Sequence, residues 1–390
     1  MTKHGWISGL ALVLSTAATA PHHITPTPLT PNEQHIKQIL HNLVTREDNA
    51  IITGHKADLR SIILPHSDAL ARAEKRARYL KVWATSRGLD VRGITISLRT
   101  PHIRFVGRGR VNIFGVVGES YRVTKKNAAP VKDAPDDRFG LGVRHDYVLV
   151  KERGQWFIAS DDFTDPLNQD TRLLHQALPA QGSVQAHPPA ISSRGAEKAV
   201  QYANTYCGSA PGCGNDRYYN SDYTSYNGEG GDCTNFVSQA LHAGGFLMSP
   251  HWEYSQARGE GSPAWVNADR LKDFLESSGH ATLYASGPYN KLTRPLPRFP
   301  DGAVNALRPG DLISYVEGHR AVHTAIVVGY DTLGFPVVDT HTSDRYRVPW
   351  DLGWDRRTIY DLWHVHYPRS VVFRTSSPRS PGTGDIMNHR

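Results

Sequence analysis

A pair of glycines leads directly into a helical pattern whose first residue is a cysteine. Gly230 and Gly231 precede Asp232 and Cys233, and apolar side chains then recur with helical spacing as far as Leu241. The first turn of a helix leaves N–H groups unpaired and carries the positive end of the helix dipole, so it favours an anion. We therefore expect the pKa of the Cys233 thiol to lie below its free value of about 8.5, which makes this residue a candidate nucleophile. The alternative is an unreactive cysteine packed as a small apolar side chain, and Asp232 is expected to cap the helix or brace the turn rather than act in catalysis.

Two segments downstream of this helix are typical of neighbouring strands in an antiparallel sheet. Residues 321–330 and 336–341 are separated by a short turn, and side chains alternate faces along each strand. If the hairpin centres midway between them, His323 lies opposite about His341 and diagonal to Asp339. Two histidines, or a histidine and a carboxylate, can then meet on one face, as a general base and the group that orients it require. The alternative for His323 is a histidine whose hydrogen bonds are satisfied in the core.

Four motifs together resemble one family of hydrolases. They are Gly-Gly-Asp-Cys-Thr-Asn-Phe-Val-Ser-Gln, Pro-Gly-Asp-Leu-Ile, His-Thr-Ala-Ile-Val-Val-Gly and Thr-His-Thr-Ser-Asp-Arg-Tyr. This set resembles the putative amidase domain family, which is grouped with the CHAP and NlpC/P60 papain-like cysteine hydrolases, and it extends over about residues 194–368. The resemblance implies a papain-like fold, in which the helix that carries the cysteine packs on an antiparallel sheet.

The resemblance also implies roles for single residues. Cys233 is the nucleophile and His323 the base, and a polar residue on the next strand is the third member, for which His341 is assigned and Asp339 is the alternative. The thiolate then attacks an amide carbonyl, and water cleaves the resulting thioester. The backbone N–H of Cys233, with Tyr226 as the second donor, is expected to hold the oxyanion. The alternative for Tyr226 is an aromatic residue of the loop that only packs.

The cysteine count suggests one disulfide and one free thiol. Cys207 and Cys213 bracket a turn-rich loop that can bring their sulfurs together, and Cys233 is the third cysteine of the chain. We expect the first two to pair, which suits an oxidising compartment. The alternative is that all three cysteines are reduced and inert.

The N-terminal residues resemble a secretory signal. A lysine at position 3 is followed by an apolar run over residues 6–14, and small side chains end at Ala20. We therefore expect residues 1–20 to be a signal peptide, and the protein to be secreted and extracellular or associated with the cell wall. No later stretch approaches the roughly 20 apolar residues that a membrane span needs.

The remaining length predicts two globular parts. Residues 21–162 predict helices followed by strands, an α+β domain of unknown role whose element order resembles cystatin or NTF2-like folds. Residues 163–194 are typical of a linker, residues 195–374 form the predicted amidase domain, and residues 375–390 form a tail expected to be disordered. Helices are expected at residues 31–53 and 68–87, and strands at residues 91–98, 103–106, 111–117, 147–151 and 155–159. No catalytic constellation is evident in the first part.

Charge and composition indicate which classes of binding partner to expect. The formal net charge of +7 suits an anionic cell envelope. Basic side chains are not clustered among stacking aromatic residues, so no nucleic acid is expected as a partner. A peptide or the peptidoglycan of a bacterial cell wall is the expected substrate, and no cofactor is expected.

Two rival functions remain at the level of sequence. A zinc amidase could use His364 and His366, but no third ligand follows at a recognised spacing, so no metal is expected. The second rival is a non-catalytic module that binds the cell envelope and keeps the fold of a hydrolase.

Overall fold

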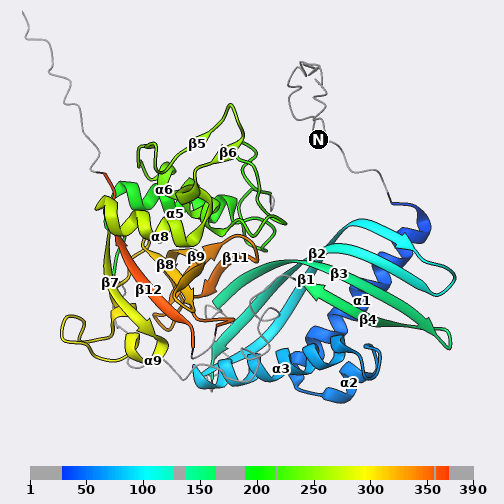
Figure 1. The fold of residues 1–390 in the computed structure, drawn as a ribbon. Coiled ribbons are helices and arrows are strands. Elements are labelled where there is room, and N and C mark those ends of the chain that lie inside the picture. The colour runs from blue at the N-terminus through cyan, green and yellow to red at the C-terminus, as the bar shows by residue number, and fades with distance from the viewer. Residues whose placement is uncertain (1–28, 127–136, 164–188, 216–217, 355–356, 369–390) are drawn as a thin grey trace, which may run out of the picture.

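One antiparallel sheet of ten strands runs through the molecule (Figure 1). The computed structural model describes residues 29–126, 137–163, 189–215, 218–354 and 357–368. Neighbouring strands follow the order β1-β2-β3-β11-β10-β9-β8-β12-β7, and β4 pairs with β3. The strands are β1 (Leu89–Phe105), β2 (Arg110–Lys125), β3 (Asp137–Glu152), β4 (Gln155–Phe163), β7 (Ala281–Pro288), β8 (Leu312–Glu317), β9 (Arg320–Tyr330), β10 (Pro336–Thr340), β11 (Asp344–Pro349) and β12 (Ile359–Val365). The predicted mixture of helices with a large antiparallel sheet is confirmed.

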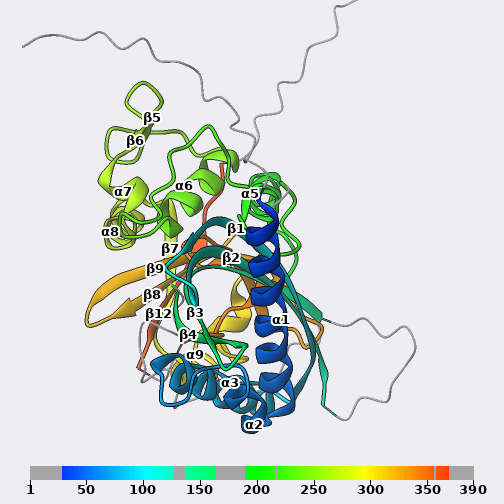
Figure 2. The same ribbon diagram turned by 90° about the vertical axis from the view of Figure 1, so that its right-hand side faces the viewer.

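The N-terminal half packs three helices against its strands. Helices α1 (Pro31–Thr53), α2 (Lys56–Arg60) and α3 (Asp68–Ser86) lie beside β1 to β4 (Figure 2). A capping box begins α1, because the Thr30 hydroxyl accepts from the N–H of Glu33 and the Glu33 carboxylate accepts from the N–H of Thr30. The buried core between helices and strands includes Leu40, Ile62, Ile113 and Leu149.

The C-terminal half covers both faces of its part of the sheet. Helices α5 (Arg194–Tyr206), α6 (Cys233–Ala243) and α8 (Ala268–Ser278) lie over one face, where the core includes Phe236, Ile326 and Trp363. The opposite face packs Tyr315, Ala325, Val327 and Trp350 together with the short helix α9 (Tyr289–Leu292). The remaining short elements are α7 (Pro263–Val266), the 3-10 helix η2 (Ala303–Ala306), and the separate pair β5 (Tyr254–Ser255) and β6 (Glu260–Gly261).

The two halves are joined through the sheet and through a disulfide-closed loop. The first part of β3 pairs with β11, where Gly142 lies opposite Asp344. The loop closed by the disulfide packs on this part of β3, and a Cβ at Gly140 or Gly142 would collide with Pro211 or Ser209. Glycine is therefore required at these strand positions because another backbone lies against them.

A buried ion pair makes a second connection between the halves. Arg87, directly after α3, pairs with Asp351 in the segment that follows β11, and both side chains are fully buried. The guanidinium lies 4.0 Å from the ring centroid of Phe335 and 5.5 Å from that of Trp83. The pair therefore lies inside the joint core, where each charge depends on the other.

The helices predicted at residues 31–53 and 68–87 are confirmed by α1 and α3. The strands predicted at residues 91–98 and 103–106 form one strand, β1, with an irregularity between Arg99 and His102. The predicted signal peptide (1–20), the tail (375–390) and residues 164–188 of the predicted linker (163–194) lie outside the described residues. Within the described segments, no helix combines the length and the apolar character that crossing a membrane requires.

Candidate active site

Cys233 is the first residue of α6, and Asp232 occupies the N-cap position. The cysteine is 8% exposed, and its sulfur lies 3.7 Å from Oγ1 of Thr234. Burial raises the pKa of the Cys233 thiol, and the charge of Asp232 adds to this, while the backbone N–H of Thr324 and the Thr234 hydroxyl act to lower it. The predicted depression of the pKa is therefore wrong for this structure, because desolvation outweighs the hydrogen bonds to the sulfur.

The thiol lies against β9 at the peptide group of Thr324. Backbone pairing between β9 and β10 stops before this residue, so its N–H and C=O have no β10 backbone partner. Side chains interact with the N–H and the C=O of Thr324 instead. The hydroxyl of Thr340 donates to the Thr324 carbonyl at 2.9 Å, and the Thr324 N–H acts on the sulfur of Cys233. The nucleophile candidate is thereby placed at the end of a strand ladder, beside the residue that follows His323.

His323 lies in β9 directly before Thr324, and its ring packs with aromatic side chains. Its ring centroid lies 5.6 Å from that of Trp354, and its Nε2 lies 3.1 Å from Oγ1 of Thr340. Burial, with the charge of Arg345, lowers the pKa of His323 to about 3, so the imidazole is neutral at physiological pH. Across the part of the chain that the structure describes, no hydrogen bond joins His323 to Cys233.

The register predicted for β9 and β10 is wrong by one residue. Pairing skips Val328, which bulges out of β9, and this shift exchanges the faces that the following side chains share. His323 therefore meets Thr340, whereas His341 and Asp339 point to the other face. Asp339 accepts a hydrogen bond from the backbone of β11 at 2.7 Å, and burial raises its pKa to about 7. Neither residue predicted as the third member contacts the base.

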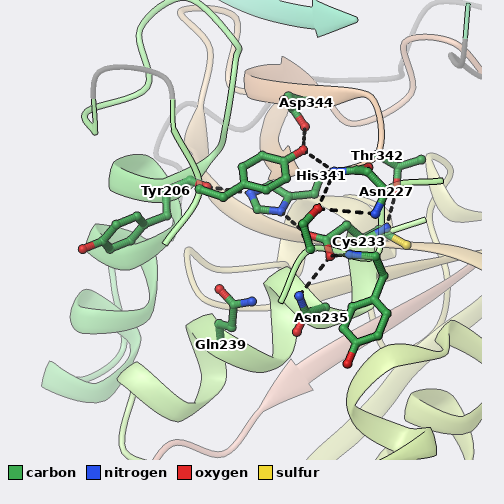
Figure 3. A network of polar contacts seen from close by, with 12 residues as sticks. Tyr206, Asn227, Cys233, Asn235, Gln239, His341, Thr342 and Asp344 are labelled. Atoms are coloured by element: carbon green, nitrogen blue, oxygen red, sulfur yellow. Dashed lines mark hydrogen bonds and ion pairs between the residues drawn. The ribbon is translucent and has the colours of Figure 1, made fainter. Parts of the chain in front are cut away.

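His341 is paired with Asp232 instead. Its Nδ1 lies 2.6 Å from Oδ2 of Asp232, and its Nε2 lies 2.6 Å from the carbonyl oxygen of Tyr206. Its ring stacks on Tyr219 with a centroid distance of 3.9 Å. The two hydrogen bonds occupy both ring nitrogens, and in Figure 3 the sulfur of Cys233 points away from this imidazole. His341 therefore links the end of α5 to the start of α6 and has no nitrogen left to accept a thiol proton.

Asp232 braces the turn before α6 rather than capping the helix. Its side chain makes no cap hydrogen bond. Its Oδ1 accepts from the N–H of Tyr226 at 2.8 Å and from Nδ2 of Asn235 at 2.9 Å, and its own N–H donates to the hydroxyl of Thr342. The phenol oxygen of Tyr226 accepts from the N–H of Gly261 at 2.9 Å, so this hydroxyl keeps its own hydrogen. The role of Tyr226 toward an oxyanion stays a prediction.

Asp344 of β11 is a supporting residue that the sequence reasoning missed. It accepts from the N–H of Ser209 at 2.8 Å and from the hydroxyls of Ser209 and Tyr219. Figure 3 shows Asp344 beside His341 and Thr342 in this network. Its signal in the sequence is its place in the Thr-Ser-Asp-Arg-Tyr motif, but only the pairing of β11 with β3 brings it to the loop that holds Ser209.

The predicted disulfide is present. Cys207 and Cys213 are bonded with their Cα atoms 5.5 Å apart, and Cys233 is free. The bond closes the loop that lies on β3. The carbonyl of Tyr206, which binds His341, directly precedes the first of these cysteines.

His364 lies in β12 and His366 directly follows this strand, and the two side chains have different hydrogen-bond partners. Nδ1 of His364 lies 3.0 Å from Oδ1 of Asp311, and Nε2 of His366 lies 3.0 Å from Oγ1 of Thr282. In the segments with described coordinates, no three His, Cys, Asp or Glu side chains are grouped as metal ligands.

A buried group of ionisable side chains in the N-terminal half was also missed from the sequence. Arg76 contacts Glu119 at 2.6 Å, and His145 contacts Asp161 at 2.7 Å. Burial, with the charge of Asp161, raises the pKa of the nearby Glu47 to about 7. Glu47, Arg76 and Asp161 line a cavity of about 10 Å³, which is room for about one water molecule. We assign this group to the packing of the half.

Comparisons with known proteins agree with the C-terminal motifs. The model of the family described as putative amidase domain matches residues 193–362. An uncharacterised protein of Bacillus subtilis (strain 168), YhbB, is 32% identical over 154 residues, which are 37% of this chain and 40% of that protein. The chain thus spans less than half the length of this relative.

Solved structures show only weak overall similarity. A putative scytalone dehydratase from Novosphingobium aromaticivorans is 15% identical, with 35% of this chain and 87% of that chain covered and a TM-score of 0.24. A domain of unknown function with a cystatin-like fold from Nostoc punctiforme is 12% identical, with 35% and 78% covered and a TM-score of 0.20. TM-scores of this size do not establish a common fold.

The family match covers the helix that carries Cys233 and the strands that carry His323 and Thr340. The segment from residue 193 to residue 362 therefore matches the putative amidase domain family.

Proposed function

We propose that residues 193–362 act as a cysteine hydrolase that cleaves amide bonds, with Cys233 as the nucleophile and His323 as the base. The observation that carries this proposal is the contact of the thiol with the peptide group of Thr324, directly after His323. Acyl transfer needs a nucleophile beside a base. The match to the putative amidase domain family supports an amide as the bond that is cleaved.

The two groups start the reaction uncharged. Burial raises the pKa of Cys233 and lowers that of His323, so thiol and imidazole are both neutral at pH 7. The thiol proton therefore moves to the imidazole while the sulfur bonds to the carbonyl carbon. Because no hydrogen bond joins the two side chains in the described structure, the ring must turn toward the sulfur or act through one bridging water.

The remaining steps return the site to its starting state. The C–N bond breaks, the His323 imidazolium gives its proton to the leaving amine, and the acyl group stays on Cys233 as a thioester. Water then attacks the thioester, His323 accepts a proton from it, and the proton passes to the departing sulfur. The products are an amine, a carboxylic acid and the free thiol.

The start of α6 is suited to hold the negative oxygen of the intermediate. Among the described residues no side-chain cap is present at this helix, so the N–H groups of its first turn are left for an anion. The hydroxyl of Tyr226 keeps a hydrogen that can serve as a second donor. In the proposed mechanism these donors form the oxyanion hole.

We further propose that the substrate is the peptide of a bacterial cell wall and that the protein acts outside the cytoplasm. The disulfide between Cys207 and Cys213 suits an oxidising compartment, and the net charge of +7 suits an anionic polymer. The signal-like N-terminal sequence points the same way. These features support the location and select the first substrate to test.

The test compares the full chain with Cys233→Ala on purified peptidoglycan, followed by mass spectrometry of the released fragments. We expect new amine and carboxyl ends only from the unaltered protein, with a loss of at least about 10³-fold in the variant. Thr293→Val is the matched control, because its hydroxyl is buried and donates only to the Tyr289 carbonyl within α9.

Two negative results separate the parts of the proposal. Fragments released equally by the unaltered protein and by Cys233→Ala would exclude Cys233 as the nucleophile. No release from peptidoglycan, with cleavage of other peptide amides, would exclude only the substrate. No cleavage of any amide, with retention of Cys233→Ala on sedimented peptidoglycan, would favour the binding module.

A further inference from the structure

The hydroxyl of Thr340 makes the contact with His323 that sequence analysis assigned to His341 or Asp339. Thr340 is the last residue of β10, and the residue is 1% exposed. Its Oγ1 lies 3.1 Å from Nε2 of His323 and 2.9 Å from the carbonyl oxygen of Thr324. A third, longer contact of 3.3 Å leads to the carbonyl oxygen of His341.

The partners of this hydroxyl decide the direction of each hydrogen bond. A carbonyl oxygen can only accept, so the one hydrogen of Thr340 goes to a carbonyl, and the 2.9 Å distance selects that of Thr324. This carbonyl has lost its β10 backbone partner and needs a donor. The lone pairs of Thr340 then face His323, whose Nε2 must carry a hydrogen to make the bond.

Fixing the hydrogen on Nε2 leaves the other nitrogen of the neutral ring as the base. A neutral imidazole carries one hydrogen, so Nδ1 of His323 has a free lone pair. In the described part of the chain Nδ1 has no hydrogen-bond partner. The tautomer held by Thr340 is the one in which the ring can take a proton from a thiol.

We propose that Thr340 is the positioning residue of the site: its hydroxyl holds His323 as the Nε2–H tautomer and so presents Nδ1 to Cys233. This inference rests on the proposed function of Cys233 and His323. Thr340 touches neither the sulfur nor the bond to be cleaved and acts through His323. Because of the bulge at Val328, Thr340 lies beside His323, where the predicted register would place its neighbours in the chain.

The first experiment needs no substrate and reads the tautomer of His323 in the unaltered protein. Nitrogen-15 spectra of histidine-labelled full chain at pH 7, with His323 assigned by its loss in His323→Gln, report which ring nitrogen carries the hydrogen. We expect a protonated Nε2 and an unprotonated Nδ1. A hydrogen on Nδ1 would overturn the proposal.

The second experiment measures the rate of alkylation of Cys233 by iodoacetamide at pH 7. We expect Thr340→Val to lose about tenfold, as His323→Gln does, because both remove an oriented base. Thr340→Ser keeps the hydroxyl and should stay within about threefold of the unaltered protein. Thr293→Val, which removes a buried hydroxyl elsewhere, should leave the rate unchanged. Near-UV circular dichroism verifies that each variant is folded.

The outcomes distinguish the inference from the function on which it rests. If His323→Gln is slow and Thr340→Val matches the unaltered protein, Thr340 does not position the base, and the roles of Cys233 and His323 stand. If His323→Gln also matches the unaltered protein, His323 is not the base and both proposals fall. If Thr340→Val does not fold, failure of Thr340→Ser to retain the rate contradicts the inference.

Discussion

At the scale of single residues, the sequence and the structure give opposite directions for the pKa shift of the Cys233 thiol. The helix start favours a thiolate, but burial and the neighbouring Asp232 raise the pKa of the thiol. We expect the alkylation rate of Cys233 in the native protein to rise with a midpoint at higher pH than in the unfolded chain. The same measurement in urea should give a midpoint near the free value of about 8.5.

The direction of this pKa shift follows from the form of the thiol that the folded state disfavours. Burial penalises the thiolate, so the native state holds the proton to higher pH than the unfolded chain does. Cys233→Ala, whose two remaining cysteines are bonded to each other, controls for labelling elsewhere. A native midpoint below pH 8 would mean that the field of the helix start exceeds the cost of desolvation.

Sequence reasoning placed Cys233 at a helix start, paired Cys207 with Cys213, and predicted a hairpin with His323 on its first strand. It could not place Thr340, because one bulged residue reverses the faces of every side chain beyond it. Gly329 directly follows Val328, and a glycine inside a strand can mark a bulge, but it does not show which residue is skipped or in which register pairing resumes. The third position therefore depends on a backbone irregularity that an alternating pattern does not reveal.

At the scale of elements, the loop closed by the disulfide lies directly against β3. We expect Gly140→Ala to lower the free energy of unfolding by about 1–3 kcal/mol, because its Cβ would collide with the backbone of Pro211. Urea unfolding measures this change. Gly109→Ala is the control, since the nearest atom to its Cβ would be the Lys151 carbonyl oxygen at 3.6 Å. Equal stability of the two variants would show that the loop can move off the strand.

The pairing of β3 with β11 was beyond the reach of sequence patterns. Alternation of apolar side chains predicts that a strand exists and which face it buries, but it does not name the partner strand. Here Gly142 pairs with Asp344, some two hundred residues later in the chain, as part of a sheet that both predicted domains share. The small residues of β3 mark a close approach only once the loop that lies on them is known.

At the scale of the whole molecule, the shared sheet and the buried pair of Arg87 and Asp351 predict that the halves unfold together. Arg87→Met should cost about 3–5 kcal/mol, because it leaves a buried carboxylate without its partner. Adding Asp351→Leu should recover much of this loss, since the double variant removes the unpaired charge. Hydrogen exchange followed by mass spectrometry in increasing urea measures the opening of peptides from β1–β2 and from β8–β9 separately. We expect Arg87→Met to shift both sets to lower urea by the same amount. A shift confined to one set would show that the halves are independent units despite their common sheet.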